Sequence, residues 1–382
     1  MVFVRRLAVR GFRNLSSQEI ELAHGVTLLW GPNGAGKTNA LEALCVGLSG
    51  RSCRTRAERE AVAFDEPLAR VEVEVEAGAG DRRVFRWSLA RSGERRHTVN
   101  GEAVSSQHWT GRPPLSIFLP DRLALVKGPP ANRRAQLDRL SAALWPARAD
   151  ARQRYGRALA QRNALLGRVR ARIAPTAALD AWDAELAADG VALMAARRAA
   201  TAGLAAEFAA AAAELGLPGE ASLVYRPRSE ARDPQQLQAE LRERREGDIS
   251  RGHTRHGPHL DELELSLGGR SLRRYGSQGE QRGALLALLF AERRALLEAR
   301  ASPLMLLDDV MSELDPERRA LLARRLQEGG GQAVLTATEP EQLPRGCQRA
   351  EIALRHGEAI ALGRATEGRV ARAAGAELPA PA

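Results

Sequence analysis

Aromatic residues, cysteines and long hydrophobic runs are all scarce in this 382-residue sequence. Aromatics make up 4%, too few for a broad platform that stacks single-stranded bases, so nucleic-acid binding should depend on backbone phosphates. Cys45, Cys53 and Cys347 form no CxxC pair, which excludes a four-ligand zinc site and a disulfide framework. The longest apolar run, 284–291, is far shorter than the ~20 residues that span a bilayer. We therefore expect an intracellular protein with no membrane span and no secretory signal.

Positive charge is in excess and is almost entirely arginine. Lys and Arg total 57 against 47 Asp and Glu, a net charge of +10. The planar guanidinium of arginine suits phosphate, so a polyanionic partner is the first interpretation. The alternative is that a high-GC genome has enriched arginine and alanine. Hydrophobic residues make up 44%, enough for a core, and the length favours two domains or one domain with a large insertion.

The hydrophobic pattern predicts an α/β protein with a helical segment in its middle. Strands are expected near 3–10, 18–22, 26–30, 70–76, 84–89 and 97–104, and again near 263–267, 304–307 and 333–335. Strong helix formers dominate 133–215, with one break at Ala174-Pro175, which predicts a long helical hairpin. A polar stretch follows at 226–258, and an apolar helix is expected over 284–297.

A phosphate-binding loop follows the third strand. The run matches GxxxxGK[ST] in full, with a strand before it and a helix after it; its residues are Gly31, Pro32, Asn33, Gly34, Ala35, Gly36, Lys37 and Thr38. Glycines allow backbone N–H groups to surround phosphate oxygens, and the helix adds its positive end. Lys37 is expected to neutralise the β- and γ-phosphates of ATP, and Thr38 to bind Mg²⁺.

Two consecutive carboxylates end a buried strand. The apolar run 304–307 delivers Asp308 to the edge of the sheet where Mg²⁺ should lie, so Asp308 is the predicted metal ligand together with Thr38. Asp309 is the candidate that polarises the attacking water. Its alternative role is to cap the turn that follows. The predicted catalytic residues are Lys37, Asp308 and Asp309.

The segment 277–282 resembles the signature motif of ATP-binding-cassette ATPases, and 312–315 resembles their D-loop. In that family the signature contacts the γ-phosphate held by a second subunit, so two ATP molecules join two heads. The resemblance implies that Ser277, Gly279 and Gln281 act in trans, and that Asp315 couples the two sites. It further implies an ATP-dependent homodimer.

The helical insertion between the two cassette halves is the layout of the SMC-like branch, and within that branch the chain resembles the RecF family of bacterial gap-repair proteins. The motifs that carry the resemblance are Gly11-Phe12-Arg13-Asn14, Gly50-Arg51-Ser52, the segment 118–138, Gly257-Pro258-His259, 277–282 and 306–318. The resemblance adds Arg13 and Asn14 to the expected nucleotide site.

The RecF resemblance also implies a function and partners. These are weak, DNA-stimulated ATP hydrolysis in recombinational repair and replication-fork maintenance, and binding to gaps and junctions between double- and single-stranded DNA. The implied protein partners are RecR, through which a recombinase is loaded, and RecO-type mediators. The implied location is the cytoplasm, on the nucleoid. The expected domains are an ATPase head in two halves, 1–120 with a β-rich lobe and 251–362, a helical arm at 121–250, and a disordered tail at 363–382.

The arm carries the expected DNA contacts. Residues 130–175 contain eleven arginines against Asp138 and Asp150. The candidate DNA contacts are Arg133, Arg134, Arg148 and Arg152. The alternative, which has equal weight, is that these arginines belong to a basic helix face that is only solvated. The chain departs from the family pattern at Gln136, Leu260 and Glu280, and it has no identified Q-loop glutamine or switch histidine.

Three other functions stay open at this level. One is an ATP-gated DNA clamp that does not hydrolyse ATP, and another is a chromosome-organising ATPase of SMC type. The third is the nucleotide-binding subunit of a membrane transporter, which is disfavoured because its signature would lie much nearer the phosphate-binding loop.

Overall fold

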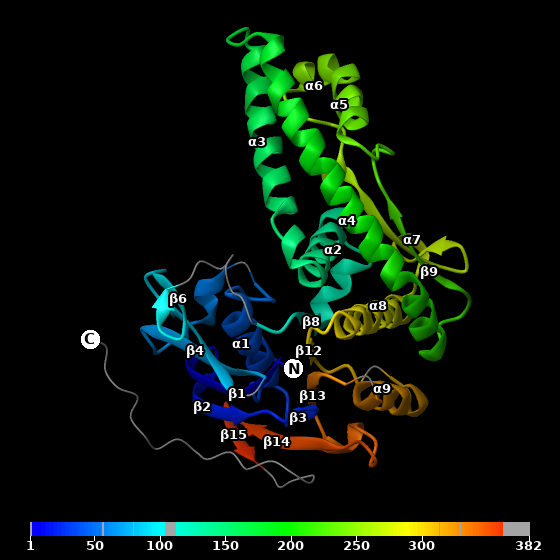
Figure 1. Ribbon diagram of the computed structural model, residues 1–382. Coiled ribbons are helices and arrows are strands. Elements are labelled where there is room, and N and C mark those ends of the chain that lie inside the picture. The colour runs from blue at the N-terminus through cyan, green and yellow to red at the C-terminus, as the bar shows by residue number, and fades with distance from the viewer. Residues whose placement is uncertain are drawn as a thin grey trace. The chain divides into compact units, whose positions relative to one another are not determined.

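The computed structural model describes residues 2–55, 57–78, 80–103, 112–312, 314–328 and 330–361 (Figure 1). Contacts divide the chain into two compact units, which we name the head unit (1–122 and 296–382) and the arm unit (123–295). The predicted tail at 363–382 lies outside the described residues. Within the described parts, no helix combines the length and the apolar character that a bilayer crossing requires.

Two six-stranded sheets form the head unit. The first is antiparallel in the order β2-β1-β4-β5-β6-β7. The second has the order β15-β14-β3-β13-β12-β8 and is parallel except for β15. The bounds are β1 Val2–Phe12, β2 Leu15–Glu21, β3 Val26–Trp30, β4 Leu68–Ala77, β5 Asp81–Ala90, β6 Arg95–Val99, β7 Glu102–Ala103, β8 Leu115–Phe118, β12 Leu304–Leu307, β13 Gln332–Ala337, β14 Arg349–Arg355 and β15 Glu358–Ala361.

Helix α1 (Lys37–Ser49) packs against strands of both sheets, and its apolar side chains complete the core of the head unit. Strand β4 alternates, with Val71, Val73 and Val75 buried, as expected for a sheet with one covered face. By contrast, every residue of β12 and β13 is buried, because parallel strands are covered on both faces. The unit also contains α9 (Pro316–Glu328) and short 3-10 segments at Glu58–Ala61 and Pro340–Gln342.

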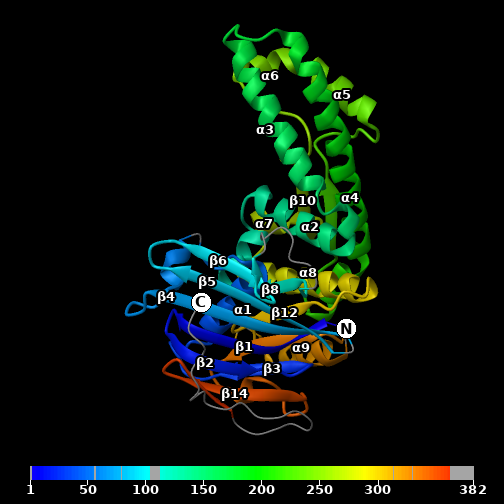
Figure 2. The same cartoon turned by 60° about the vertical axis from the view of Figure 1, so that its left-hand side comes forward.

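The arm unit is a helical hairpin backed by a small sheet. Helices α3 and α4 lie side by side and meet at a loop beside α6 (Figures 1 and 2). The three-stranded sheet has the order β11-β10-β9. The bounds are α2 Pro130–Leu144, α3 Ala151–Arg170, α4 Leu179–Glu214, β9 Ala221–Arg226, α5 Pro234–Glu243, α6 Arg245–Arg251, β10 Glu262–Leu267, β11 Arg270–Ser271, α7 Leu272–Tyr275 and α8 Gln278–Glu298, with 3-10 segments at Pro120–Leu125, Pro146–Arg148, Thr176–Ala178 and Pro258–Leu260.

The fold class agrees with the sequence expectation, and the element bounds differ in places. The predicted helical hairpin, with its break at Ala174-Pro175, is present as α3 and α4. The stretch 226–258, which the sequence marks only as polar, contains α5 and α6. The contacts also put 251–295 in the arm unit, which differs from the boundary expected at residue 250. The physical reason is pairing: β10 is hydrogen-bonded to β9, and the carboxylates at its start hold arginines of the helices.

The base of the arm unit is held by a buried arginine. The Arg197 guanidinium, 3% exposed, binds both carboxylate oxygens of Asp138 at 2.7 and 3.0 Å and Asp261 at 3.0 Å. It also donates to the Pro258 carbonyl at 2.6 Å, and Tyr225 donates to Asp261. One side chain of α4 therefore ties α2 to the loop before β10.

We expect Arg197→Leu to lower the free energy of unfolding of the arm unit by about 3–5 kcal/mol, because the buried carboxylates of Asp138 and Asp261 both lose their hydrogen bonds to the buried guanidinium. Urea unfolding followed by helical circular dichroism measures this loss. Arg157→Leu is the control, since Arg157 is exposed on α3, and it should change the stability by less than about 0.5 kcal/mol. Equal stability of both variants would contradict the prediction.

Candidate nucleotide-binding site

The loop between β3 and α1 has the backbone that a phosphate cradle requires. Gly31, Gly34 and Gly36 all have positive φ, at 148°, 79° and 102°. A Cβ at Gly31 would lie 2.1 Å from the Leu354 carbonyl oxygen, so a larger residue would displace the loop from β14. The loop ends at the first turn of α1, whose N–H groups have no partner within the helix and can bind an anion. Pro32, Asn33 and Gly34 are exposed, and Ala35 and Gly36 are buried.

Lys37 is folded back over this loop. Its ammonium donates to the carbonyl oxygens of Gly31 at 2.7 Å and Pro32 at 3.0 Å. Burial lowers the pKa of Lys37, and the nearby carboxylates of Asp309 and Asp308 oppose that shift. The ammonium has a third donor and stands where an additional negative charge would stabilise it.

Asp308 joins three elements of the head unit. It follows β12, and its carboxylate accepts hydrogen bonds from the Thr38 hydroxyl at 2.9 and 3.0 Å and from the Thr336 hydroxyl of β13 at 2.7 Å. Burial raises the pKa of Asp308, and the two hydroxyl donors oppose the rise. A cation placed against Asp308 would therefore relieve the cost of keeping this carboxylate charged.

Asp309 has an unusual backbone and an oxygen without a partner. Its φ is +48°, the left-handed region that is uncommon for residues other than glycine, and its N–H donates to the Thr336 hydroxyl at 2.9 Å. Its Oδ1 atom is buried and accepts no hydrogen bond from the described residues. A buried carboxylate oxygen normally has a partner, so this atom indicates a group that the site binds.

These residues fit a nucleotide-bound Mg²⁺ ion. Thr38 and Asp308 supply hard oxygen ligands within hydrogen-bonding distance of each other, and the unpartnered Asp309 oxygen lies one residue away. Among the described residues, no cluster of three or more His, Cys, Asp or Glu side chains could hold a metal by itself. Proteins commonly bind Mg²⁺ through one or two carboxylates together with the phosphates of the substrate.

Arg13 and Asn14 support the loop from the turn after β1. Asn14 donates to the Gly34 carbonyl at 2.8 Å and accepts from Asn39 of α1 at 2.7 Å. Arg13 binds the fully buried Glu42 carboxylate at 3.0 and 3.1 Å. Glu42 also accepts from Ser52 and Arg54. The described contacts thus make Asn14 a support of the loop, and they pair the Arg13 guanidinium with Glu42 and the Glu60 carbonyl.

The expected signature motif opens α8 in the arm unit. The Ser277 hydroxyl accepts from the Glu280 N–H at 3.2 Å, and the Glu280 carboxylate accepts from the Ser277 N–H at 2.7 Å, which is a capping box. A Cβ at Gly279 would meet no atom within 4 Å, so this surface is open. The Gln281 amide instead points inward and donates to the Leu272 carbonyl at 2.9 Å. The described contacts give Gln281 a structural role at the start of α8, and its action in trans stays a prediction.

Asp315, the expected D-loop residue, precedes α9 in the head unit. Its carboxylate accepts from the Arg318 N–H at 2.9 Å, and it forms an ion pair with the Arg318 side chain at 3.3 Å. The described contacts give it the role of a helix cap. Coupling between two sites stays a prediction.

Known proteins resemble this chain over most of its length. A family model described as RecF/RecN/SMC N terminal domain matches residues 3–359. The DNA replication and repair protein RecF of Heliobacterium modesticaldum is 36% identical over 360 residues, covering 90% of this chain and 95% of the relative. That of Anaeromyxobacter dehalogenans is 39% identical over 349 residues, covering 87% and 91%. The chain belongs to the RecF family.

Solved structures agree with this assignment. A structure of the recombination mediator protein RecF with ATP, from the RecFOR pathway, matches with a TM-score of 0.84 and 26% identity, covering 95% of this chain and 98% of that one. An Smc head domain from Pyrococcus furiosus matches with a TM-score of 0.60 and 17% identity, covering 95% and 96%, which shows a shared fold. The expected ABC-type ATPase head is therefore confirmed.

The arginines expected to contact DNA in this RecF-family chain differ in their surroundings. Arg133 is buried: it forms an ion pair with Glu262 at 2.7 Å and donates to three backbone carbonyls. Arg133 is therefore corrected to a structural residue. Arg134 is half-buried and donates to the Asp261 carbonyl at 2.8 Å, and burial lowers its pKa. Arg148 is exposed beside the Trp145 ring, and Arg152 is exposed with Asp138 at 3.5 Å.

The sequence analysis does not include two residues that support the site, Thr336 and Glu42. Thr336 lies in a fully buried strand, and nothing in the pattern marks its hydroxyl as the partner of both Asp308 and Asp309. Glu42 could have been found, because it is a lone carboxylate within the apolar run 40–46. A charge at such a position needs buried partners.

We expect Thr336→Val to lower the rate of ATP hydrolysis about 10- to 100-fold, the usual effect of removing a residue that orients metal ligands. ATP affinity should change little, because Lys37 and the loop remain. Steady-state ATPase assays with a nucleotide-binding measurement test this. Thr338→Val is the matched control, since Thr338 contacts Gln342 rather than the carboxylates. Equal rates for the two variants would contradict the prediction.

Proposed function

We propose that this chain is an ATP-dependent DNA-binding protein of recombinational repair and replication-fork maintenance, and a weak, DNA-stimulated ATPase. One observation carries the proposal. The Thr38 and Thr336 hydroxyls hold Asp308 beneath the phosphate-binding loop, and a buried Asp309 oxygen next to it has no partner among the described residues. A structural ion pair would have satisfied that oxygen, whereas a hydrolytic site needs an acceptor for water there.

Each of the described groups would have a separate role in ATP hydrolysis. The loop N–H groups and Lys37 bind the phosphates, and Thr38 and Asp308 would hold Mg²⁺, which when bound neutralises charge on the β- and γ-phosphates. Asp309 would accept a hydrogen bond from the attacking water and orient it. Thr336 positions the Asp308 carboxylate and the Asp309 backbone.

Dimerisation and DNA binding complete the proposal. As in the resembling ATPases, Ser277 and Gly279 would contact the γ-phosphate of a second copy, and their open surface supports this. The exposed arginines of the arm would bind the phosphates of gapped or junction DNA. RecR and RecO-type mediators are the proposed protein partners, because the related structure comes from the RecFOR pathway. The proposed location is the cytoplasm, where the chromosome lies.

The test measures ATPase rate and oligomeric state together, with Mg²⁺ and ATP, in the presence and absence of gapped duplex DNA. We expect a low basal rate that DNA raises and a dimer that requires ATP. Lys37→Met should abolish both, because it removes the cation that neutralises the phosphates. An ATP-dependent dimer on DNA without turnover would instead favour the clamp. No effect of DNA on either quantity would refute the DNA assignment.

A mixing experiment tests the site in trans. Lys37→Met and Ser277→Arg should each be inactive alone, because each removes one side of every composite site. An equal mixture should recover part of the wild-type rate, because a heterodimer contains one intact composite site and neither homodimer contains any. Glu280→Gln is the control, because it keeps the capping hydrogen bond and should remain active. No recovery in a mixture that forms heterodimers would contradict action in trans.

A further inference from the structure

The loop between α3 and α4 closes with a backbone that favours glycine but contains arginine. The Arg172 N–H donates to the Val169 carbonyl and the Ile173 N–H to the Arg168 carbonyl, both at 2.9 Å, the pattern of a Schellman turn. Arg172 occupies the left-handed position of that turn, with φ of +59°. Glycine is the usual residue there, because a side chain is strained in this conformation. The Arg172 side chain therefore occupies this position despite the strain of its left-handed backbone conformation.

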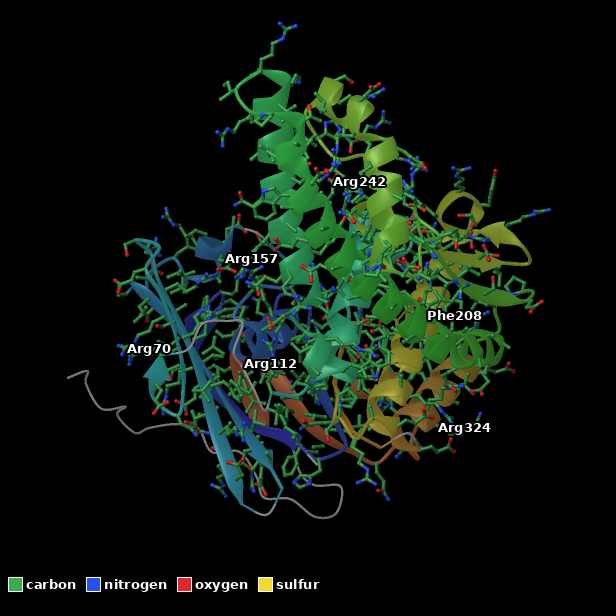
Figure 3. The ribbon with its side chains drawn as sticks, turned by 45° about the horizontal axis from the view of Figure 1, so that its top comes forward. Arg70, Arg112, Arg157, Phe208, Arg242 and Arg324 are labelled. Carbon is green, nitrogen blue, oxygen red and sulfur yellow. The ribbon has the colours of Figure 1, made fainter. Side chains whose placement is uncertain are left out.

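The next residue, Ile173, leaves most of its apolar side chain exposed to solvent. In a Schellman turn this position normally packs back on the last helical turn. Here Ile173 is 69% exposed, because the small core below it is filled by others: Leu166, Val169, Leu179, Leu165, Ala174 and Ile249. Side chains of this loop extend from the end of the hairpin at the top of Figure 3. The turn therefore presents a β-branched apolar group on a backbone held by hydrogen bonds.

Positive charge surrounds this isoleucine. From residue 151 to residue 179 the sequence contains seven arginines and no carboxylate. Arg168, Arg170 and Arg172 are exposed, and their guanidinium groups form no hydrogen bond or ion pair with the described residues. Arg251, His253 and Arg255 of the neighbouring segment are also exposed. By contrast, Arg154 nearer the base of α3 is paired with Asp189 at 3.0 Å.

We propose that residues 168–175, which we name the arm tip, are a DNA wedge. Ile173 enters the base stack where a duplex meets a single-stranded gap, and Arg168, Arg170 and Arg172 bind the flanking phosphates. Architectural proteins use the same combination of an inserted aliphatic side chain and basic flanks. The end of a duplex at a gap is the least costly place to unstack a base, since one neighbour is already missing. A protein partner that buries Ile173 would require carboxylates to match these arginines, whereas DNA supplies phosphate at every step.

The proposed wedge depends on the proposed DNA-binding function. The experiment distinguishes a failure of the wedge from a failure of DNA binding. The probe is gapped duplex DNA with 2-aminopurine at the base pair next to the gap, whose fluorescence rises on unstacking. The full chain with ATP and Mg²⁺ should raise this fluorescence, and Ile173→Ser should abolish the rise. The Kd of Ile173→Ser should increase by less than about tenfold, because the phosphate contacts remain.

Three further variants complete the design. Ile173→Leu should restore the signal, because the wedge needs an aliphatic group of similar size. Ile360→Ser removes an exposed isoleucine of the head unit and should leave the signal at the wild-type level. The triple variant Arg168→Gln, Arg170→Gln, Arg172→Gln should weaken binding to gapped and continuous duplexes alike and reduce the log–log salt slope by about 3.

The outcomes distinguish the two proposals. If Ile173→Ser binds gapped DNA and unstacks the reporter base as the wild type does, the wedge is refuted and the DNA-binding function stands. If the wild type binds no gapped DNA under ATP, both are refuted. If the fluorescence rise is lost in Ile173→Ser and retained in Ile173→Leu and Ile360→Ser, the arm tip is the unstacking element.

Discussion

A buried carboxylate, that of Asp308, joins parts of the head unit that lie far apart in the sequence. Thr38 and Asp308 are 270 residues apart, and the whole arm unit lies between them in sequence. The hydrogen bonds from Thr38 and Thr336 join α1, β12 and β13 at the edge where the parallel strands end. Because burial raises the pKa of Asp308, its charge must be stabilised by donors and cations gathered there. The Thr38 and Thr336 hydroxyls supply two of these donors, and the proposed Mg²⁺ ion would supply a cation.

In the arm unit, arginine has three physical roles that composition cannot separate. Arg162 and Arg197 are buried and paired with carboxylates. Arg133 is also paired with Glu262, and in addition it satisfies three backbone carbonyls of the segment before α2. The exposed arginines of the arm tip have no carboxylate near them in sequence and form no ion pair with the described residues. This third group is available to a polyanion, so the basic surface of the arm is smaller than its arginine count suggests.

The departures from the RecF pattern are accommodated locally. Gln136 is buried and donates to the Glu292 carboxylate at 2.6 Å, so its amide has a partner within the arm unit. Glu280 adds negative charge near the signature, and that charge stabilises the first turn of α8 through the Ser277 N–H. Leu260 is 45% exposed, two residues after Pro258, whose carbonyl accepts a hydrogen bond from Arg197.

Elements whose signal is local follow from the amino-acid sequence alone. The glycine pattern with Lys37 and Thr38, the apolar strand before Asp308 and the helix formers broken at Pro175 depend on neighbours a few residues away, so periodicity and spacing predict them. Which polar side chains meet depends instead on the tertiary fold. Arg133 reaches Glu262 across 129 positions, and Thr336 reaches Asp308 only because β12 and β13 are adjacent. Pairing between distant strands and helices leaves no periodic trace in sequence, which is why the buried arginines, the Thr336 support and the exposed Ile173 required the fold.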